Sequence, residues 1–326
     1  MFEFLINKLR AHPRKIVFTE GTDPRILEAA ARLLSGNFLT PVLVGNPEEV
    51  MAAAEKAGFN IRGAEIIDPA SFEDMDKMVD EMVALRKGKM TADECRATLL
   101  QANYFGTMLV KMGYADALLG GATYSTADTV RPALQLVKTK PGNKIVSSCF
   151  IMVRPSATGS NEVLAMGDCA INIKPNEDEL VEIALETAKT AKIFGIDPKV
   201  AFLSYSTKGS GKGEDVDKVR NACAKAKQLA PELALDGEMQ FDAAVSPHVG
   251  QLKFPGSPVA GHANTFIFPD INAGNIGYKI AQRLGNFDAY GPILQGLNAP
   301  INDLSRGCNA LEVYSMAIIT AALCED

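Results

Sequence analysis

Strand-like and helix-like segments alternate along almost the whole sequence, and this alternation restricts the possible fold more than any other feature. KIVFTEG (15–21) has the pattern of a short buried strand. Asp23-Pro24 then opens the helical PRILEAAARLL (24–34) with a capping residue and a proline at the first helical position. TPVLVG (40–45) is the next strand. Strands that alternate with helices predict a mostly parallel sheet covered on both faces.

One region departs from the alternation. KIVSSCFIMVR (144–154) and EVLAMGDCAIN (162–172) are successive strands with no helix between them, which predicts antiparallel neighbours. A turn-rich TKPGN (139–143) precedes them, and a second Gly/Pro-rich passage, YGPILQGLNAP (290–300), comes near the end. A final helix is expected from about Ser305 onward. The pattern therefore predicts two α/β lobes with a cleft between them.

The composition excludes several classes of protein. The chain has 326 residues, 47% of them hydrophobic and 22% charged, which suits a globular protein of two domains. Its net charge is -6 and no window is densely basic, so we expect no nucleic-acid partner and no anionic-membrane anchor. No apolar run reaches the ~18 residues of a membrane span. The first residues lack the pattern of a secretion signal, so we expect a cytoplasmic protein.

The cysteines and histidines do not form a metal-binding pattern. The six cysteines are scattered and include no C-x-x-C pair, which indicates reduced thiols. The three histidines are too few and too separated for a metal cluster, so we expect no metal. Among the cysteines, only Cys308, close to Arg306, has a setting that merits a test of reactivity.

The loop YSTKGSGKGED (Tyr205–Asp215) follows an apolar run, where phosphate-binding loops usually lie. A Walker A loop needs G-x-x-x-x-G-K-[ST], and here Gly211-Lys212 is followed by Gly213. No G-x-G-x-x-G opens a helix after an early strand either. The pattern argues against a nucleotide P-loop. It leaves open both a solvated surface loop and a contact with some other phosphate.

GGATYSTADTVRPALQ (120–135) is a stronger candidate for an anion site. The hydroxyls of Ser125 and Thr126 lie at a predicted helix start, where anions are favoured, and Arg131 follows in the second turn. Ordinary helix capping by Ser125, Thr126 or Asp128 explains the same residues and does not exclude an anion.

NAPINDLSRGCNALEVY (298–314) contains the most unusual motif, Ser305-Arg306-Gly307. If Ser305 caps the final helix, Arg306 lies at the positive end of that helix, which is unfavourable unless an anion compensates. Arg306 is therefore a ligand candidate. Glu312 has two interpretations: Asn309-x-x-Glu312 resembles a capping box, and a carboxylate here could also act as a general base.

Several of these stretches, taken together, resemble the phosphate acetyltransferase family. The resemblance covers essentially the whole chain, includes GGATYSTADTVRPALQ, and is most specific in PINDLSRGC together with FPDINAGNIGYK. It implies an enzyme that interconverts acetyl-CoA plus phosphate with acetyl phosphate plus CoA. No metal or nucleotide cofactor is implied, and CoA is a substrate. The resemblance also implies a homodimer.

The resemblance implies a two-lobed α/β fold like that of isocitrate and isopropylmalate dehydrogenases. The first domain would comprise residues 1–142 plus 296–326, and the second, residues 143–295, would be inserted into it. The two turn-rich passages fit these crossings.

Site residues follow from the same resemblance. Arg86, Arg131 and Arg306 match the ligand-binding arginines, although Arg86 taken alone, beside two lysines, has the pattern of a solvated charge. Ser305 matches the serine beside the reacting centre. Glu312 stands where the best-known family pattern has an aspartate base, so its role as base or as capping residue stays open. The remaining matches line the acyl-phosphate pocket: Ser125, Thr126 and Tyr290.

We expect direct transfer in a ternary complex, without an acyl-enzyme. Glu312 would take the proton of the CoA thiol, directly or through water. Ser305 would donate a hydrogen bond to the thiol or to the developing oxyanion. Arg306 and Arg131 would hold the phosphoryl group, and Arg86 would help to retain CoA or phosphate.

Three alternatives remain at this point. A phosphate butyryltransferase would differ in the size of its acyl pocket, which a sequence does not reveal. A decarboxylating dehydrogenase of similar architecture would need NAD(P) and a metal held by a carboxylate cluster, and no such cluster is visible. A non-catalytic binding protein would not need the chemically competent side chains found at every matched position. The physiological direction and any effectors are not indicated.

Overall fold

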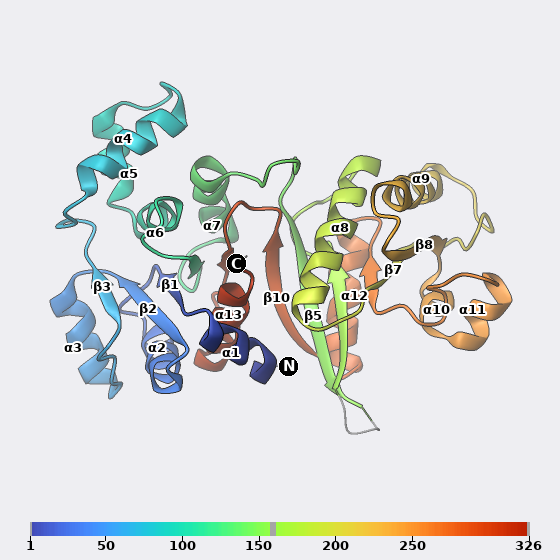
Figure 1. The fold of residues 1–326 in the computed structure, drawn as a ribbon, viewed down its shortest axis with the longest axis horizontal. Helices are drawn as coiled ribbons and strands as arrows, with labels where there is room; N and C mark the ends of the chain where they lie inside the picture. The colour runs from blue at the N-terminus through green and yellow to red at the C-terminus, as the bar shows by residue number, and fades with distance from the viewer. Residues whose placement is uncertain (1, 157–160, 325–326) are drawn as a thin grey trace. The chain divides into compact units, whose positions relative to one another are not determined.

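The computed structural model describes residues 2–156 and 161–324. The chain divides into two compact units, each with its own sheet (Figure 1). The discontinuous unit comprises Phe2–Pro141 and the chain from Leu297 onward, and the continuous unit comprises Gly142–Gly296. Both units combine strands with helices, so the fold is α/β, as the alternating pattern predicted.

The sheet of the discontinuous unit is entirely parallel, in the order β11-β4-β1-β2-β3. Its strands are β1 (Arg14–Phe18), β2 (Leu39–Val44), β3 (Glu65–Ile67), β4 (Ala117–Gly120) and β11 (Ile301–Asp303). Its helices are α1 (Phe2–Ala11), α2 (Pro24–Gly36), α3 (Pro47–Ala57), α4 (Met75–Arg86), α5 (Ala92–Leu99), α6 (Ala102–Lys111), α7 (Thr126–Pro132), the π-helical turn η1 (Ala133–Val137) and α13 (Ala310–Ala322).

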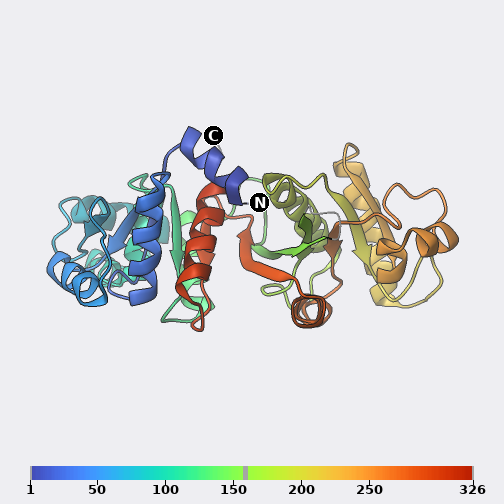
Figure 2. The same ribbon diagram turned by 90° about the horizontal axis from the view of Figure 1, so that it is seen from below.

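The start of α2 follows its local sequence signals. The side chain of Asp23 accepts a hydrogen bond from the Arg25 backbone N–H, and Pro24 occupies the first helical position, where its missing N–H costs nothing. The predicted cap is therefore confirmed. The buried face of α2 packs against β2, and α13 lies beside α2 (Figure 2).

One helix prediction was wrong in its start. The final helix begins at Ala310, not near Ser305. Asn309 caps it, because Asn309 and Glu312 form a reciprocal capping box. The interpretation of Ser305 as a helix cap, and of Arg306 as a cation in the first helical turn, is therefore wrong.

The connection pattern creates a switch point in this sheet. From β1 the chain moves to β2 and β3 on one side, whereas β4 and β11 lie on the other side of β1. The strand ends of β1 and β4 therefore lead into loops that diverge in opposite directions. In open parallel sheets, ligands usually bind beyond the carboxyl ends of strands at such a point.

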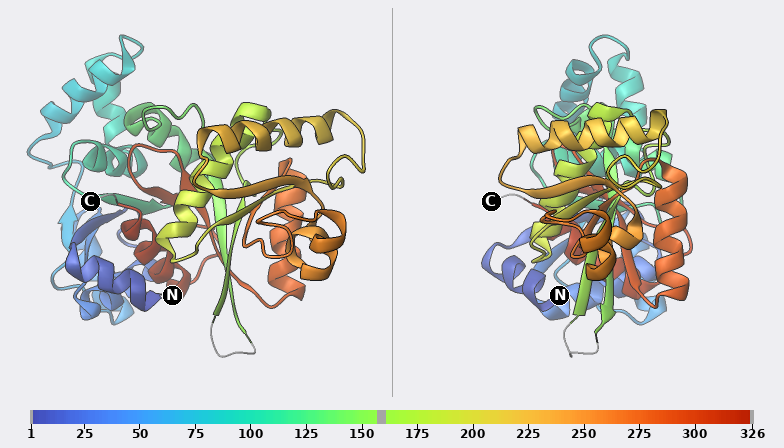
Figure 3. Two further views of the ribbon diagram at one scale, coloured as in Figure 1. Left: turned by 45° about the vertical axis from the view of Figure 1, so that its right-hand side comes forward. Right: turned by 90° about the vertical axis from the view of Figure 1, so that its right-hand side faces the viewer.

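The continuous unit contains a mixed sheet in the order β10-β5-β6-β9-β7-β8. Its strands are β5 (Ser147–Pro155), β6 (Asn161–Gly167), β7 (Lys199–Leu203), β8 (Ala234–Met239), β9 (Thr265–Ile267) and β10 (Asp288–Gln295). Its helices are α8 (Glu177–Ile193), α9 (Glu214–Leu229), α10 (Phe241–Val245), α11 (Pro247–Lys253) and α12 (Ile271–Leu284). β5 and β6 run side by side as the predicted antiparallel pair (Figure 3).

Two separate hydrophobic cores cover the two faces of this sheet. Alternate residues of a strand point to opposite faces. Accordingly, Val200 and Phe202 of β7 belong to a core with α8 and α9, whereas Ala201 and Leu203 belong to a second core that includes residues of α10 and α12. In the described part of the chain, no helix is long and apolar enough to cross a membrane.

Candidate active site at the carboxyl ends of β1, β4 and β11

Three loops meet at one edge of the sheet in the discontinuous unit. They follow β1 (19–23), β4 (121–125) and β11 (304–309), whose strands are adjacent and parallel. Parallel neighbours end at the same edge of a sheet. Segments separated by up to 283 residues in sequence are therefore joined by direct hydrogen bonds.

Glu20 joins the first loop to the second. Its Oε1 accepts hydrogen bonds from the backbone N–H groups of Gly121 (3.0 Å) and Thr123 (3.2 Å), and its Oε2 accepts one from Thr19 Oγ1 (2.8 Å). Burial raises the pKa of Glu20, and the hydrogen bond from Thr19 offsets part of this rise. Glu20 was not among the predicted residues.

Asp303, at the end of β11, joins the third loop to α7. Its Oδ2 accepts a hydrogen bond from Thr126 Oγ1 (2.5 Å) and its Oδ1 accepts one from Thr129 Oγ1 (2.6 Å). Burial raises the pKa of the Asp303 carboxyl, which these two hydroxyls oppose. Gly121 lies so close that a Cβ built on it would be 2.2 Å from Asp303 Oδ1, and its φ of +101° also favours glycine.

Arg25 connects all three loops. Its Nη1 donates to the carbonyl oxygens of Arg306 (2.8 Å) and Cys308 (3.2 Å). Its Nη2 donates to the Ala122 carbonyl oxygen (2.9 Å) and to Asp23 Oδ2 (2.7 Å), and its Nε donates to Asp23 Oδ1 (3.0 Å). Hydrogen bonding to Asp23 raises the pKa of the guanidinium, so Arg25 is a permanent cation.

Sequence reasoning missed Arg25, although a signal for it was present. A cation in the first turn of a helix is unfavourable unless an anion compensates. This reasoning was applied to Arg306, which lies before the helix start, whereas Arg25 does occupy the first turn of α2. The compensating anion is Asp23 of the protein itself.

Ser305 and Arg306 lie in the third loop, and both side chains are exposed. Ser305 Oγ accepts a hydrogen bond from the Gly307 backbone N–H (3.2 Å), and the Ser305 carbonyl accepts one from Cys308 N–H (2.9 Å). The turn closes just before Asn309, which caps α13. Both side chains are therefore already accessible to a ligand.

Glu312 is exposed on the first turn of α13. Its Oε2 accepts a hydrogen bond from the Asn309 backbone N–H (3.0 Å), and Asn309 Oδ1 accepts one from the Glu312 backbone N–H (2.9 Å). The capping-box interpretation is therefore confirmed. The capping carboxylate is also exposed to solvent, so the geometry is compatible with both predicted roles.

The hydroxyls predicted to line a pocket already have partners. Ser125 Oγ donates to Asp128 Oδ2 (2.6 Å), as expected for capping at the start of α7, and Thr126 donates to Asp303. Arg131, on the last turn of α7, is exposed, and its Nη1 is 3.5 Å from Asp128 Oδ1. An exposed ion pair of this kind is weak, so it leaves Arg131 available for another anion.

The remaining two predicted residues lie outside the three loops. Arg86 occupies the last turn of α4, and its Nε is buried without a hydrogen-bond partner among the described residues. A buried donor normally has a partner, so this nitrogen is suited to an acceptor. Tyr290 lies on β10 of the continuous unit, half-buried, and this burial raises the pKa of its hydroxyl.

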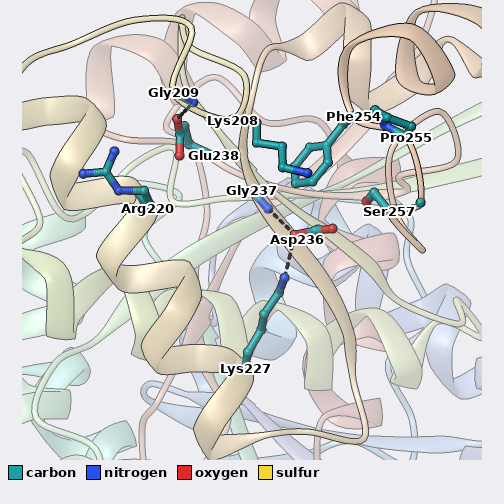
Figure 4. Close-up of a pocket in the computed structure, with 11 residues that line it drawn as sticks. Lys208, Gly209, Arg220, Lys227, Asp236, Gly237, Glu238, Phe254, Pro255 and Ser257 are labelled. Atoms are coloured by element: carbon teal, nitrogen blue, oxygen red, sulfur yellow. Dashed lines mark hydrogen bonds and ion pairs between the residues drawn. The ribbon is translucent and has the colours of Figure 1, made fainter.

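In the loop over 205–215, a carboxylate of the protein accepts hydrogen bonds from two of the donors. Glu238 Oε1 accepts hydrogen bonds from Ser206 Oγ (3.0 Å) and from the Gly209 backbone N–H (2.7 Å). Figure 4 shows Glu238 beneath this loop and the Lys208 ammonium against the Phe254 ring, 5.0 Å from its centroid. A cavity of about 500 Å³ adjoins them. The nearby Lys227 is paired with Asp236 at 2.6 Å.

Within residues 2–156 and 161–324, no group of three or more His, Cys, Asp or Glu side chains is placed to hold a metal ion. All six cysteines are free thiols and buried. Burial raises the pKa of the Cys308 thiol, an effect that Arg25 only partly opposes.

Comparisons with known proteins identify relatives along the whole chain. A sequence model of the family described as phosphate acetyl/butaryl transferase matches residues 1–321. The phosphate acetyltransferase of Bacillus subtilis (strain 168) is 54% identical over 322 residues, which cover 99% of this chain and 98% of that relative. The solved phosphotransacetylase from Streptococcus pyogenes is 56% identical, covers 98% of both chains and superposes with a TM-score of 0.94.

A more distant structure extends the likeness of the fold alone. A protein described as 4-hydroxythreonine-4-phosphate dehydrogenase from Salmonella typhimurium has 13% sequence identity and a TM-score of 0.54, over 95% of this chain and 99% of its own. The two-unit α/β architecture is thus related to that of a dehydrogenase, as the resemblance had implied.

Proposed function

The chain belongs to the phosphate acetyl/butaryl transferase family, and we propose that it transfers an acetyl group reversibly between CoA and inorganic phosphate by direct thiolate attack in a ternary complex. The sulfur–carbon bond of acetyl-CoA forms as the carbon–oxygen bond of acetyl phosphate breaks, and phosphate leaves. The proton of the CoA thiol passes to a base on the protein. The acetyl group is not bonded covalently to the enzyme at any stage.

The observation that carries the proposal is the position of the Ser305–Arg306 loop. It lies at the carboxyl ends of parallel strands beside the switch point, where open sheets place their ligands. Its serine hydroxyl and its guanidinium are both exposed there. A hydroxyl suits an oxyanion, and a guanidinium suits a phosphoryl group.

The proposed roles divide the chemistry among a carboxylate, a hydroxyl and guanidinium groups. Glu312 accepts the thiol proton, directly or through water. Ser305 donates a hydrogen bond to the thiol or the developing oxyanion. Arg306 and Arg131 hold the phosphoryl group, and the unpaired Nε of Arg86 supports its role in retaining CoA or phosphate.

We propose that Ser125, Thr126 and Tyr290 line the acyl-phosphate pocket, which requires two of these hydroxyls to change their hydrogen-bond partner when the substrate binds. The Ser125 and Thr126 hydroxyls now donate to carboxylates, so each must change partner to donate to acetyl phosphate. Tyr290 lies on β10 of the continuous unit.

The cysteines support direct transfer rather than an acyl-enzyme. The thiolate is the nucleophilic form of cysteine, and burial disfavours it. Cys308 is the only cysteine in the three loops, and burial raises the pKa of its thiol. None of the three loops contains a histidine, so none of them supplies Ser305 with the histidine base that usually activates a serine nucleophile.

The partners and the compartment are part of the same proposal. We infer a homodimer, because α12 exposes Ile276 (58%), Ile280 (54%) and Leu284 (80%) at intervals of four residues, which form one apolar stripe on a helix. We infer the cytoplasm, because all six cysteines are free thiols, as in a reducing compartment. The proposed reaction needs no metal and no nucleotide cofactor.

The function is tested by measuring the free thiol released from acetyl-CoA with and without inorganic phosphate. Phosphate-dependent release, with acetyl phosphate as the product, supports it. Release without phosphate would indicate a hydrolase instead. In a single turnover with labelled acetyl-CoA, label on the denatured protein would overturn direct transfer. Parallel assays with propionyl- and butyryl-CoA define the acyl range, which separates acetyl from butyryl transfer.

A further inference from the structure

We propose that Arg25 is a positioning residue for acetyl transfer, which holds the Ser305–Arg306 loop in the conformation that presents those two side chains to the substrates. This inference rests on the function proposed above. It concerns a residue that lies outside the proposed reacting groups and acts through the backbone of the loop that carries them.

The guanidinium of Arg25 donates hydrogen bonds to backbone carbonyls in two loops. Nη1 donates to the carbonyl oxygens of Arg306 (2.8 Å) and Cys308 (3.2 Å), and Nη2 donates to that of Ala122 (2.9 Å). These bonds connect the loop after β11 with the loop after β4. Asp23 holds the guanidinium itself through Nε and Nη2 at 3.0 and 2.7 Å. All three nitrogens of Arg25 are therefore occupied by acceptors of the protein.

Arg25 differs in this respect from the arginines proposed to bind ligands. Arg306 and Arg131 have exposed side chains, and Arg86 has an unpaired Nε. Arg25, in contrast, would have to give up a carbonyl or a carboxylate in order to bind an anion. Its geometry suits support of the loop rather than contact with substrate.

The loop needs this support because its own bonds are few. Leu304 N–H donates to the Gly120 carbonyl (2.7 Å) at its start, and the Asn309–Glu312 capping box fixes its end. Between these points the internal bonds run within the turn, from Gly307 and Cys308 to Ser305. Arg25 therefore supplies bonds that tie the middle of the loop to the rest of the unit.

The choice of arginine follows from the number of acceptors. A guanidinium presents five N–H donors in a rigid plane, which can serve one carboxylate and three carbonyls at once. A lysine ammonium has three donors at one point and cannot span the same acceptors. Misplacing a reacting group by about 1 Å can cost about 10²-fold in rate, so loss of this support is expected to reduce turnover.

The test compares Arg25→Ala and Arg25→Lys with a matched control, Arg32→Ala. Arg32 lies on the same helix, is exposed and pairs with Glu28 at 2.5 Å, outside the three loops. We expect kcat to fall about 10²-fold in Arg25→Ala, by less in Arg25→Lys, and not at all in Arg32→Ala. Free guanidinium at concentrations too low to unfold the protein is expected to restore part of the activity of Arg25→Ala, which a globally damaged fold would not allow.

A second measurement does not depend on activity. Cys308 is buried and its Sγ lies 3.7 Å from Arg25 Nη1, so loosening of the loop should expose its thiol. Alkylation of each cysteine is followed by peptide mass spectrometry. We expect Cys308 to react faster in Arg25→Ala, while Cys223, buried in the continuous unit on α9, reacts as in the wild type.

The outcomes are distinguishable. Reduced kcat with guanidinium rescue and faster Cys308 alkylation supports the inference. A folded Arg25→Ala with kcat within about threefold of the wild type overturns it, because positioning effects of this kind are far larger. Reduced kcat without rescue and with unchanged Cys308 alkylation also overturns it. If the wild type itself transfers no acetyl group, the proposed function fails, and Cys308 alkylation still shows whether Arg25 holds the loop.

Discussion

Asn309 and Glu312 cap each other: the Glu312 carboxylate accepts a hydrogen bond from the Asn309 N–H at 3.0 Å, and the Asn309 side chain accepts one from the Glu312 N–H at 2.9 Å. This pair sets the first residue of α13 and also determines where the preceding loop must end. The proposed base is thus held in place by the helix that it helps to begin. The structural role and the chemical role of Glu312 can be separated by experiment.

Replacing Glu312 by glutamine should separate them. The glutamine carbonyl can still accept the hydrogen bond from Asn309, so the melting temperature should fall only by the small contribution of a carboxylate charge at a helix N-terminus. The amide cannot take a proton, and loss of a general base typically lowers kcat by about 10²–10⁴-fold. Steady-state kinetics and thermal denaturation provide both readouts.

Asn309→Ala is the matched control for Glu312→Gln. It removes the side-chain cap, which costs about 1 kcal/mol of stability, and it leaves the carboxylate in place. Its melting temperature should fall while kcat changes much less than in Glu312→Gln. An unchanged kcat in Glu312→Gln would leave Glu312 as a capping residue only.

Arg306→Ala should impair turnover without affecting folding. Its side chain is exposed, whereas the backbone carbonyl that Arg25 binds is retained in the variant. Loss of one preorganised donor to a developing charge typically costs about 10²–10³-fold in kcat. The measurement is phosphate-dependent CoA release beside Arg32→Ala as control. Near-wild-type kinetics in Arg306→Ala would refute its assignment as the phosphate-binding group.

Glu20 should make stability depend on pH. Burial raises its pKa in the folded state above the ordinary 4.5, so the folded protein binds more protons than the unfolded chain between these two values. Stability attributable to Glu20 therefore falls as the pH rises through that window. In Glu20→Gln this contribution is absent. The melting temperature of the variant relative to the wild type should consequently increase from pH 4 to pH 7. A constant difference across this range would show that Glu20 titrates normally.

The apolar stripe on α12 should control the state of assembly. Ile280→Lys places a charge in the middle of the stripe, between Ile276 and Leu284. If two copies meet there, burying an unpaired charge is strongly unfavourable and the variant should be a monomer. Light scattering after size-exclusion chromatography gives the mass. Lys279→Ala, on an exposed neighbouring position, is the control and should keep the mass of the wild type. A wild-type monomer, or a dimeric Ile280→Lys, would contradict this interface.

Activity should persist after removal of metals and without added nucleotides. The proposed groups at the reacting centre are a carboxylate, a hydroxyl and guanidinium ions, none of which needs a metal to act. We expect the rate of acetyl transfer to be unchanged by a chelator and by omission of NAD. Loss of activity with the chelator, restored by a divalent cation, would show that the proposed chemistry is incomplete.

Local sequence signals predicted the elements of the fold well. The alternation of strands and helices predicted the α/β class, and Asp23-Pro24 predicted the start of α2. Two successive strand patterns (144–154 and 162–172), with no helical pattern between them, predicted the antiparallel pairing of β5 with β6. Each of these signals lies within a few residues of the feature that it predicts, so a single sequence contains it.

The wrong and missed predictions have two causes: two residues that could each cap the same helix, and hydrogen-bond partners that are distant in sequence. Ser305 and Asn309 are both acceptable helix caps, and only the reciprocal partner Glu312 decides in favour of Asn309. Glu20 and Arg25 were missed because their partners lie 101 and 281 residues away in sequence. A pattern read along the chain does not show which carbonyl oxygens face a distant guanidinium. Such partners are fixed only when the sheet brings its strands together.

The separation of 281 residues between Arg25 and the Arg306 carbonyl also governs the order in which the protein can mature during translation. β1, α2 and β4 leave the ribosome early, whereas their neighbours β11 and α13 are synthesised after the entire continuous unit. The continuous unit is a single stretch of chain and can fold while synthesis proceeds. The edge of the other sheet beside β4 stays open until β11 arrives. The newly made chain therefore acquires its proposed catalytic loop only after the whole continuous unit has been synthesised.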